Sequence, residues 1–357
     1  MASANVALVR DRLSSTVEAP RVDQLVPWSE EEFRHFGRRF QKARHRLNDT
    51  GLFTDEALAR LIDSYPRHLL QAFVMGLDPT HMEENIPVDT TRVSGADAIE
   101  AVRRGRLWFK LLRIQEWKGP YADTIYQLYT ELARRSPGFR PLTTGAVLFF
   151  GSTASQVYFH LDSKPNMLWH IRGRKRFWLY PALDTNLVSQ KCLEDVYNMV
   201  TDEDVPFKTE FDQRATVFDL DPGDALSWPH NSPHRVLVTE GMSVSLGTLH
   251  ETSDSLRRSY VIGANAFLRE KLGIRDPSMS ERGLVPSAKA FMFRAARRAG
   301  VISKSPPRKA YKTSYILDPR SALGVTQLAQ PVLTEFARGP QVPPMPLKAA
   351  SIDDASA

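Results

Sequence analysis

The chain has little cysteine: Cys192 is the single one among 357 residues. One thiol cannot form an intramolecular disulfide, and it rules out a cysteine-rich zinc site. We therefore expect a protein of a reducing compartment, the cytoplasm.

Long hydrophobic runs and repeats are missing as well. No stretch approaches the roughly 20 apolar residues that a membrane span requires, and Met1 to Arg12 contain no apolar core of a secretory signal. The sequence shows no internal repeat. We expect a protein that is neither secreted nor embedded in a membrane.

A strong charge of either sign is also absent. Forty-seven Lys and Arg against 41 Asp and Glu leave a net charge of +6, which is too small an excess to indicate a nucleic-acid partner. Residues 285–316 are an exception, with eight Lys or Arg and no acid. This segment is either a binding face for an anionic surface or acidic peptide, or a solvated helix and linker, and we favour the second interpretation.

The length exceeds that at which one hydrophobic core usually stops growing, so we expect one large domain with appended segments, or two domains. Composition and periodicity divide the chain into five parts. These are a loose N-terminal arm (1–28), a helical lead-in (29–104), a β-rich catalytic domain (105–255), a helical basic C-terminal segment (256–340) and a disordered tail (341–357).

Helix signals dominate the first third of the chain. Ser29 followed by Glu32 is a capping box, and apolar residues at helical spacing then predict a helix over about 30–47. Further helices are predicted to begin after Thr54 and after Ser94, and another near 122–135. A strand is predicted at 107–112.

From Gly145 onward the pattern changes to short β-type runs separated by turn residues. The predicted strands cover 146–150, 157–162, 167–171, 175–180, 216–220, 225–228, 234–238 and 242–249, with a helix at 190–200. Many short strands at close spacing predict a barrel or a double-sheet jelly roll. The fold class is therefore mainly β with flanking helices (α+β), and helix returns after about residue 255, including 287–299.

His160 and Asp162 are a candidate pair of metal ligands. Side chains alternate along a strand, so residues two apart point the same way, with Cα atoms about 6–7 Å apart. A distant histidine would complete the two-His, one-carboxylate set that holds Fe(II) with open positions. The loop after Trp228 offers His230 and His234 as candidates.

Over roughly residues 105–250 the chain resembles the JmjC and cupin-like 2-oxoglutarate- and Fe(II)-dependent oxygenases. The ordered motifs that carry this resemblance are His160-x-Asp162, Asn166, Gly173-x-Lys175 and Gly223-Asp224 followed by Pro229 to His234. The resemblance implies a double-stranded β-helix, or jelly roll, with Fe(II), 2-oxoglutarate as co-substrate and dioxygen. It favours His234 over His230 as the third ligand, because the family's iron-binding histidine ends a Pro-x-x-x-x-His loop.

The resemblance also assigns the co-substrate contacts. Lys175 stands thirteen residues after Asp162, where the family has a lysine that pairs with the distal carboxylate, and a fixed cation suits that dianion. Asn166 is implied as a further contact. The sequence departs at Val157, where some relatives carry a threonine, so a different hydroxyl would assist Lys175: Tyr158, Ser245 or Thr248.

The implied activity is hydroxylation of a protein or peptide side chain, or of a small metabolite, with release of succinate and CO2. Hydroxylation is favoured over demethylation. The rivals are a metal cupin with non-oxidative chemistry and a non-catalytic binding module. His170 and His250 are interpreted as structural, or at most as lining the pocket. The oligomeric state is open, with a homodimer among the options.

Overall fold

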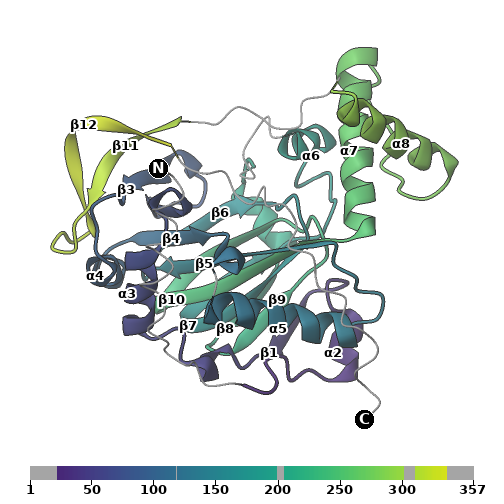
Figure 1. The fold of residues 1–357 in the computed structure, drawn as a ribbon. Helices are drawn as coiled ribbons and strands as arrows, with labels where there is room; N and C mark the ends of the chain where they lie inside the picture. Colours follow the sequence, from purple (N-terminus) through teal and green to yellow (C-terminus); the bar gives the residue numbers. More distant parts are fainter. Residues whose placement is uncertain (1–21, 118, 199–204, 301–309, 336–357) are drawn as a thin grey trace, which may run out of the picture.

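The computed structural model describes residues 22–117, 119–198, 205–300 and 310–335 of the chain. Here a strongly bent β-sheet carries helices on its outer face, and a pair of helices projects from one end (Figure 1). Within these residues no helix is both long enough and apolar enough to cross a bilayer.

Three helices, α3, α4 and α5, cover one face of the sheet. The helices are α2 (Glu30–His35), α3 (Asp55–Ser64), α4 (Gly95–Arg104), α5 (Pro120–Arg135), α6 (Gln190–Tyr197), α7 (Ser253–Leu272) and α8 (Leu284–Arg298). Short 3-10 turns are η1 (Leu47–Thr50), η2 (Arg67–Leu69), η3 (Met82–Glu84), η4 (Ile114–Glu116) and η5 (Thr209–Arg214). Leu61, Ile99 and Leu128 on the covering helices join Phe109 and Leu148 of the sheet in the largest core. This layer leaves the opposite face of the sheet for the site.

The strands form one continuous hydrogen-bonded sheet. They are β1 (Gln41–Arg44), β2 (Leu70–Val74), β3 (Ile86–Asp89), β4 (Leu107–Leu112), β5 (Thr143–Gly151), β6 (Gln156–His160), β7 (Asn166–Leu179), β8 (Thr216–Leu220), β9 (Asp224–Ser227), β10 (His234–Glu251), β11 (Ala310–Leu317) and β12 (Val325–Glu335). Their order is β1-β9-β7-β10-β5-β4-β2-β3-β11-β12, while β6 also pairs with β10 and β8 with β7.

The long antiparallel pair of β7 and β10 lies in the middle of this sheet, because the two strands pair along nearly their whole length. Residues 166–172 of β7 and 244–249 of β10 pair with each other, and the strands outside them are β9 and β5. Residues 175–179 and 234–238 also pair with each other, and the strands outside them are β8 and β6. This strand pair thus contributes to two differently flanked parts of the bent sheet, which confirms the predicted double-stranded β-helix with helices before and after it.

Gly173 lies where this strand pair bends. Its φ is +73°, and a Cβ there would lie 2.8 Å from the Met242 carbonyl oxygen. The pairing register shifts at the same level, between Val238 and Val244. The sequence predicted four separate strands here, and that is wrong: Gly173 and the Glu240-Gly241 pair form irregularities within two continuous strands, because both strands bend together.

In the lead-in, the predicted helix over 30–47 ends at His35. The capping box of Ser29 and Glu32 is present, but Gly37 takes a φ of +65° and turns the chain away. β1 then pairs with β9 at the edge of the sheet. Pairing with a distant strand therefore overrides the helical spacing of the apolar residues.

Other local signals perform better. Thr54 and Ser94 cap α3 and α4 through their side chains, and the predicted strand at 107–112 coincides with β4. The helix predicted near 122–135 is α5. The lead-in also contains the strands β1 to β3, which the helical interpretation missed because their pairing partners lie far along the chain.

Residues 22–28 pack onto the domain, in contrast to the predicted loose arm. Leu25 and Val26 are fully buried, and their backbone N–H groups donate to the Glu131 carboxylate at 3.0 and 2.8 Å. The rest of the arm (1–21) and the predicted disordered tail (341–357) lie outside the described residues.

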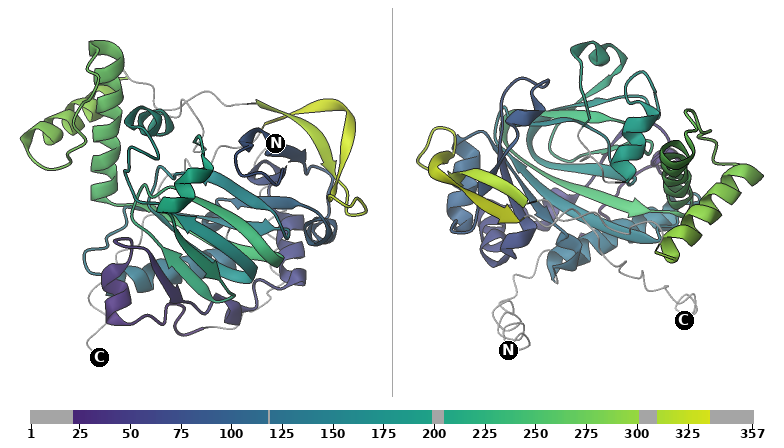
Figure 2. Two further views of the ribbon diagram at one scale, coloured as in Figure 1. Left: turned by 180° about the vertical axis from the view of Figure 1, so that it is seen from behind. Right: turned by 90° about the horizontal axis from the view of Figure 1, so that it is seen from above.

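The C-terminal segment is helical only in its first half. α7 and α8 pack against each other and extend away from the sheet (Figure 2), and α8 contains the helix predicted at 287–299. β11 and β12 then form a hairpin, and β11 pairs in parallel with β3. The helical prediction for the later residues is wrong because this hairpin extends the sheet on its β3 side.

Candidate functional site

His160, Asp162 and His234 come together at one end of the barrel. One ligand atom from each lies within 4.8 Å of the others. His160 is the last residue of β6 and His234 the first of β10, and the two face each other directly in the antiparallel pairing. Their ring centroids are 4.1 Å apart, and His234 Nε2 lies 3.3 Å from Asp162 Oδ2. We call these three residues the triad.

Backbone carbonyls orient both imidazoles of the triad. His160 Nδ1 donates to the Tyr158 carbonyl at 2.8 Å, and His234 Nδ1 donates to the Ser232 carbonyl at 3.2 Å. Because a carbonyl oxygen only accepts, each Nδ1 carries the proton. In the neutral ring this leaves the lone pair on Nε2, which is the tautomer that binds metal through Nε2.

His234 is buried among aromatic rings. Phe177 stacks on it at a centroid distance of 5.3 Å, and Trp228 lies at 5.0 Å. Burial, and secondarily His160, hold the pKa of His234 well below its ordinary value. The imidazole is therefore neutral at physiological pH, which is the form a metal requires.

Asp162 lies just beyond the end of β6 and is held by two asparagines. Asn166 Nδ2 donates to the Asp162 carboxylate, and Asn231 Nδ2 donates to the Asp162 backbone carbonyl at 3.2 Å. Asn166 was singled out by the family resemblance, whereas Asn231 was not. Together with the two imidazoles, this carboxylate makes a donor set that fits a divalent metal with open coordination positions.

Lys175 is buried on β7, at 7% exposure. It pairs with Leu220 in a regular ladder that continues to Phe177, so Lys175 shares a face with Phe177, which touches His234. Burial lowers the pKa of Lys175 to about 7. In the part of the chain that the structure describes, no carboxylate pairs with it. The barrel thus contains a cation without a counter-charge.

The arginines beside Lys175 differ from it in being exposed and paired with carboxylates. Arg174 is exposed and pairs with Asp221 and Glu240, and Arg176 pairs with Asp219 at 2.7 Å. Both lie on the opposite face of the strand, as alternation along β7 predicts.

Of the three hydroxyls predicted to assist Lys175, Ser245 is linked to its surroundings through His170, whereas Thr248 accepts a hydrogen bond from Trp169 Nε1 at 2.9 Å. The Ser245 hydroxyl is 2.9 Å from His170 Nδ1, and His170 Nε2 donates to the Gly173 carbonyl at 2.9 Å. Burial, and then the Lys175 charge, lower the pKa of His170 to about 3. We call Lys175, His170 and Ser245 the lysine site.

Tyr158 lies in a separate apolar cluster with Met75 and Trp108. Its hydroxyl is buried and makes no hydrogen bond within the described residues, and burial raises its pKa. No hydrogen bond among the described residues therefore links its hydroxyl to the lysine site. His250, predicted to be structural, is buried against Phe139 with its pKa lowered to about 3 by burial.

His230, the alternative third ligand, faces away from the triad. Its Nε2 lies 3.1 Å from the Ser163 carbonyl and 3.0 Å from the Tyr197 hydroxyl, and burial lowers its pKa to about 3. Sequence reasoning missed Tyr197 and Asn231. The turn-forming Asn-Ser-Pro sequence was a signal for Asn231, because asparagine tolerates the left-handed region, but nothing in the sequence pointed to Tyr197.

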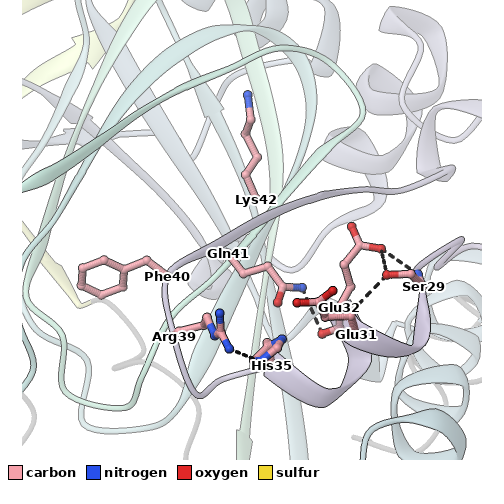
Figure 3. A pocket seen from close by; sticks show the side chains of 8 residues that line it. All are labelled: Ser29, Glu31, Glu32, His35, Arg39, Phe40, Gln41 and Lys42. Atoms are coloured by element: carbon pink, nitrogen blue, oxygen red, sulfur yellow. Dashed lines mark hydrogen bonds between the residues drawn. The ribbon is translucent and has the colours of Figure 1, made fainter.

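A surface pocket lies elsewhere, between α2 and β1 (Figure 3). Its lining consists of polar or charged residues and one phenylalanine: Ser29, Glu31, Glu32, His35, Arg39, Phe40, Gln41 and Lys42. It contains the capping box of α2 and none of the triad. His35 contacts Arg39 there (Figure 3).

A sequence profile of the cupin-like domain family matches residues 29–255. Among solved structures, the Escherichia coli ribosomal oxygenase YcfD is similar at a TM-score of 0.42 and 16% identity, covering 77% of this chain and 68% of that one. Its complex with cobalt and 2-oxoglutarate has a TM-score of 0.41, 16% identity and coverage of 79% and 69%. The DMSP lyase DddQ from Ruegeria pomeroyi has a TM-score of 0.21 and 12% identity, over 31% of this chain and 40% of that one. No curated protein matches the sequence.

Proposed function

The chain belongs to the cupin-like domain family, and from that premise we propose that it is an oxygenase that uses Fe(II) and 2-oxoglutarate. The observation that carries the proposal is the triad: two imidazoles and a carboxylate with ligand atoms within 4.8 Å of one another, and with both Nδ1 atoms held by carbonyls. Such a set holds Fe(II) and leaves positions open for other ligands.

Bound Fe(II), 2-oxoglutarate and dioxygen supply the oxidising chemistry, with succinate and CO2 as co-products and one oxygen atom transferred to the substrate. The residues of the chain bind the metal and the co-substrate and orient them. His160, Asp162 and His234 hold the metal, while Asn166 fixes the rotation of the Asp162 carboxylate. Phe177 and Trp228 pack against His234 and exclude water from its buried side.

Lys175 is the proposed anchor for the distal carboxylate of 2-oxoglutarate. A buried cation without a counter-charge is unfavourable until an anion arrives, and the resulting charge-assisted hydrogen bond is strong. Ser245 is the hydroxyl better placed to assist, since it belongs to the lysine site through His170. Tyr158 and Asn166 remain further candidates for contacts with the co-substrate.

The substrate is proposed to be a protein or peptide side chain or a small metabolite. We favour hydroxylation over demethylation, although both begin with removal of a hydrogen from carbon and differ in which carbon is presented. The reaction is balanced as 2-oxoglutarate, O2 and R–H giving succinate, CO2 and R–OH.

The decisive experiment adds Fe(II) and then 2-oxoglutarate to the metal-free protein without oxygen. We expect a visible metal-to-ligand charge-transfer band that is lost in His234→Ala and retained in His35→Ala, a histidine on α2 outside the site. Absence of the band in the native protein would contradict the proposal. Metal binding without 2-oxoglutarate binding would instead favour a non-oxidative metal cupin.

A further inference from the structure

The loop between β9 and β10 contains an asparagine in an unusual conformation. Asn231 is 5% exposed and has a φ of +65°. A side chain other than glycine is uncommon in this left-handed region, and asparagine is among those that tolerate it best. Such a conformation persists when surrounding contacts determine it.

The contacts of Asn231 reach both halves of the triad. Its Nδ2 donates to the Asp162 backbone carbonyl at 3.2 Å, and in sequence it lies three residues before His234. Asp162 is beyond the end of β6, outside the ladder that sets His160 against His234. The Asn231 amide therefore joins the aspartate to the histidine loop where the strand pairing has ended.

Tyr197 holds this amide in place. Its hydroxyl lies 2.9 Å from Asn231 Nδ2 and 3.2 Å from Asn231 Oδ1, and 3.0 Å from His230 Nε2. His230 in turn donates to the Ser163 carbonyl, one residue after Asp162. One hydroxyl thus contacts two side chains that each cross from the histidine loop to the aspartate loop.

The helices α6 and α7 contribute the residues that hold Asn231 and His230 in place. Tyr197 is the last residue of α6. Arg258 of α7 donates to the His230 carbonyl at 3.2 Å and lies 3.4 Å from Asn231 Oδ1. On the outer side of β6, Phe159 and Leu161 join Ile262 of α7 in one buried cluster. α6 and α7 lie side by side at this end of the barrel (Figures 1 and 2).

We propose that Asn231 and Tyr197 form a positioning clamp that fixes Asp162 relative to His234, so that the affinity of the triad for a divalent metal depends on them. The proposal rests on the proposed function in that the triad is the metal site. Neither residue touches the metal. Their part is to fix the ligand spacing before the metal arrives, as outer hydrogen bonds do around other metal sites.

The test measures the dissociation constant of Co(II), by competition with a chelator, together with the visible absorption spectrum of the Co(II) protein. Asn231→Gly keeps the left-handed backbone accessible but removes the amide, and Tyr197→Phe removes only the hydroxyl. Loss of outer hydrogen bonds around metal ligands typically weakens metal affinity about 10–100-fold. We expect a loss in this range for both variants, with an altered Co(II) spectrum.

Matched controls remove similar hydrogen bonds elsewhere. Asn48→Ala loses an amide that donates to the Ile171 carbonyl at 2.7 Å, and Tyr121→Phe loses a hydroxyl that donates to the Leu52 carbonyl at 2.6 Å. Both are expected to keep the native Co(II) affinity. The melting temperature of each metal-free variant reports any general loss of stability.

Native Co(II) affinity and spectrum in both Asn231→Gly and Tyr197→Phe would overturn the clamp while leaving the metal site standing. Failure of the native protein to bind Co(II) would overturn the metal site as well. The double variant sharpens the result: because both changes break one network, its loss of affinity should be smaller than the product of the two single losses. A full product would mean that the residues act separately, against the clamp.

Discussion

His234 of the triad begins β10 and Lys175 lies on its partner strand β7, yet the polar groups of the triad and of the lysine site are paired in opposite ways. At the triad, backbone carbonyls hold Nδ1 of His160 and His234, and Asn166 donates to Asp162. Lys175 is buried, and among the described residues no carboxylate pairs with it. The first arrangement suits a cation, and the second suits an anion.

The environment of Lys175 differs from that of a basic residue whose role is only to keep the surface soluble. A lysine whose role is solubility reaches water, as the exposed guanidinium groups of Arg174 and Arg176 do on the other face of the same strand. Burying Lys175 instead has a cost, which is visible in its pKa of about 7. Such a cost is typical of a group that a ligand later neutralises.

The largest effect is expected at the triad. Replacing His160, Asp162 or His234 by alanine should abolish coupled succinate formation, because each change leaves two donors for a metal that needs three. Succinate measured by mass spectrometry, with and without excess Fe(II), checks this. His35→Ala is the control, and turnover in His234→Ala at the native rate would mean that the metal ligands were wrongly chosen.

Lys175→Met should impair the lysine site and leave the triad intact. Methionine fills similar space without charge, so we expect roughly 100-fold weaker binding of 2-oxoglutarate, as for the loss of a strong charge-assisted hydrogen bond. Co(II) affinity should be unchanged. Isothermal titration calorimetry of both ligands tests the separation, and unchanged 2-oxoglutarate affinity would remove Lys175 from the co-substrate site.

The pH dependence of 2-oxoglutarate binding sharpens the same point. In the unliganded protein the pKa of Lys175 is about 7, so the ammonium is present below this pH and is lost above it. Affinity should fall as pH rises, by up to about tenfold per pH unit above the pKa, and binding should take up a proton. Calorimetry in buffers of different ionisation enthalpy measures that proton. A flat profile from pH 6.5 to 8.5 would contradict the prediction.

The same group affects stability with a definite sign. The pKa of Lys175 is lowered from the model-compound value of 10.5 to about 7 on folding, so the unfolded chain binds more protons between these values. The contribution of Lys175 is destabilising below pH 7 and vanishes as pH rises towards 10.5. Lys175→Met should therefore stabilise the ligand-free protein more at pH 7 than at pH 9.5, which thermal unfolding at both pH values would show.

The smallest effect is expected at Arg176. Arg176→Ala removes an exposed ion pair with Asp219, which is worth at most about 1 kcal/mol. Neither 2-oxoglutarate affinity nor Co(II) affinity should change, since the side chain faces away from the barrel. This variant is the matched neighbour of Lys175→Met, and a comparable loss of co-substrate affinity would show that net charge, not the buried position, matters.

Much of the fold was predictable because its signals are local. Ser29, Thr54 and Ser94 each cap the helix that the sequence assigned to them, and β4 matches its predicted range. Prediction failed where partners are distant in sequence. β1 pairs with β9, and Gly173 bends a continuous strand where the sequence indicated a turn. These outcomes depend on pairings that no short window contains.

In the candidate site, too, local features were predictable from the sequence and long-range contacts were not. The residue types and spacing of His160, Asp162 and Lys175 were readable in the chain, because alternation along a strand is a local property. Only the tertiary structure set His160 directly against His234, turned His230 away to the Tyr197 hydroxyl and enclosed Lys175 without a paired carboxylate. The physical reason is that burial, pKa and the choice between two neighbouring histidines depend on which strands and helices pack around them.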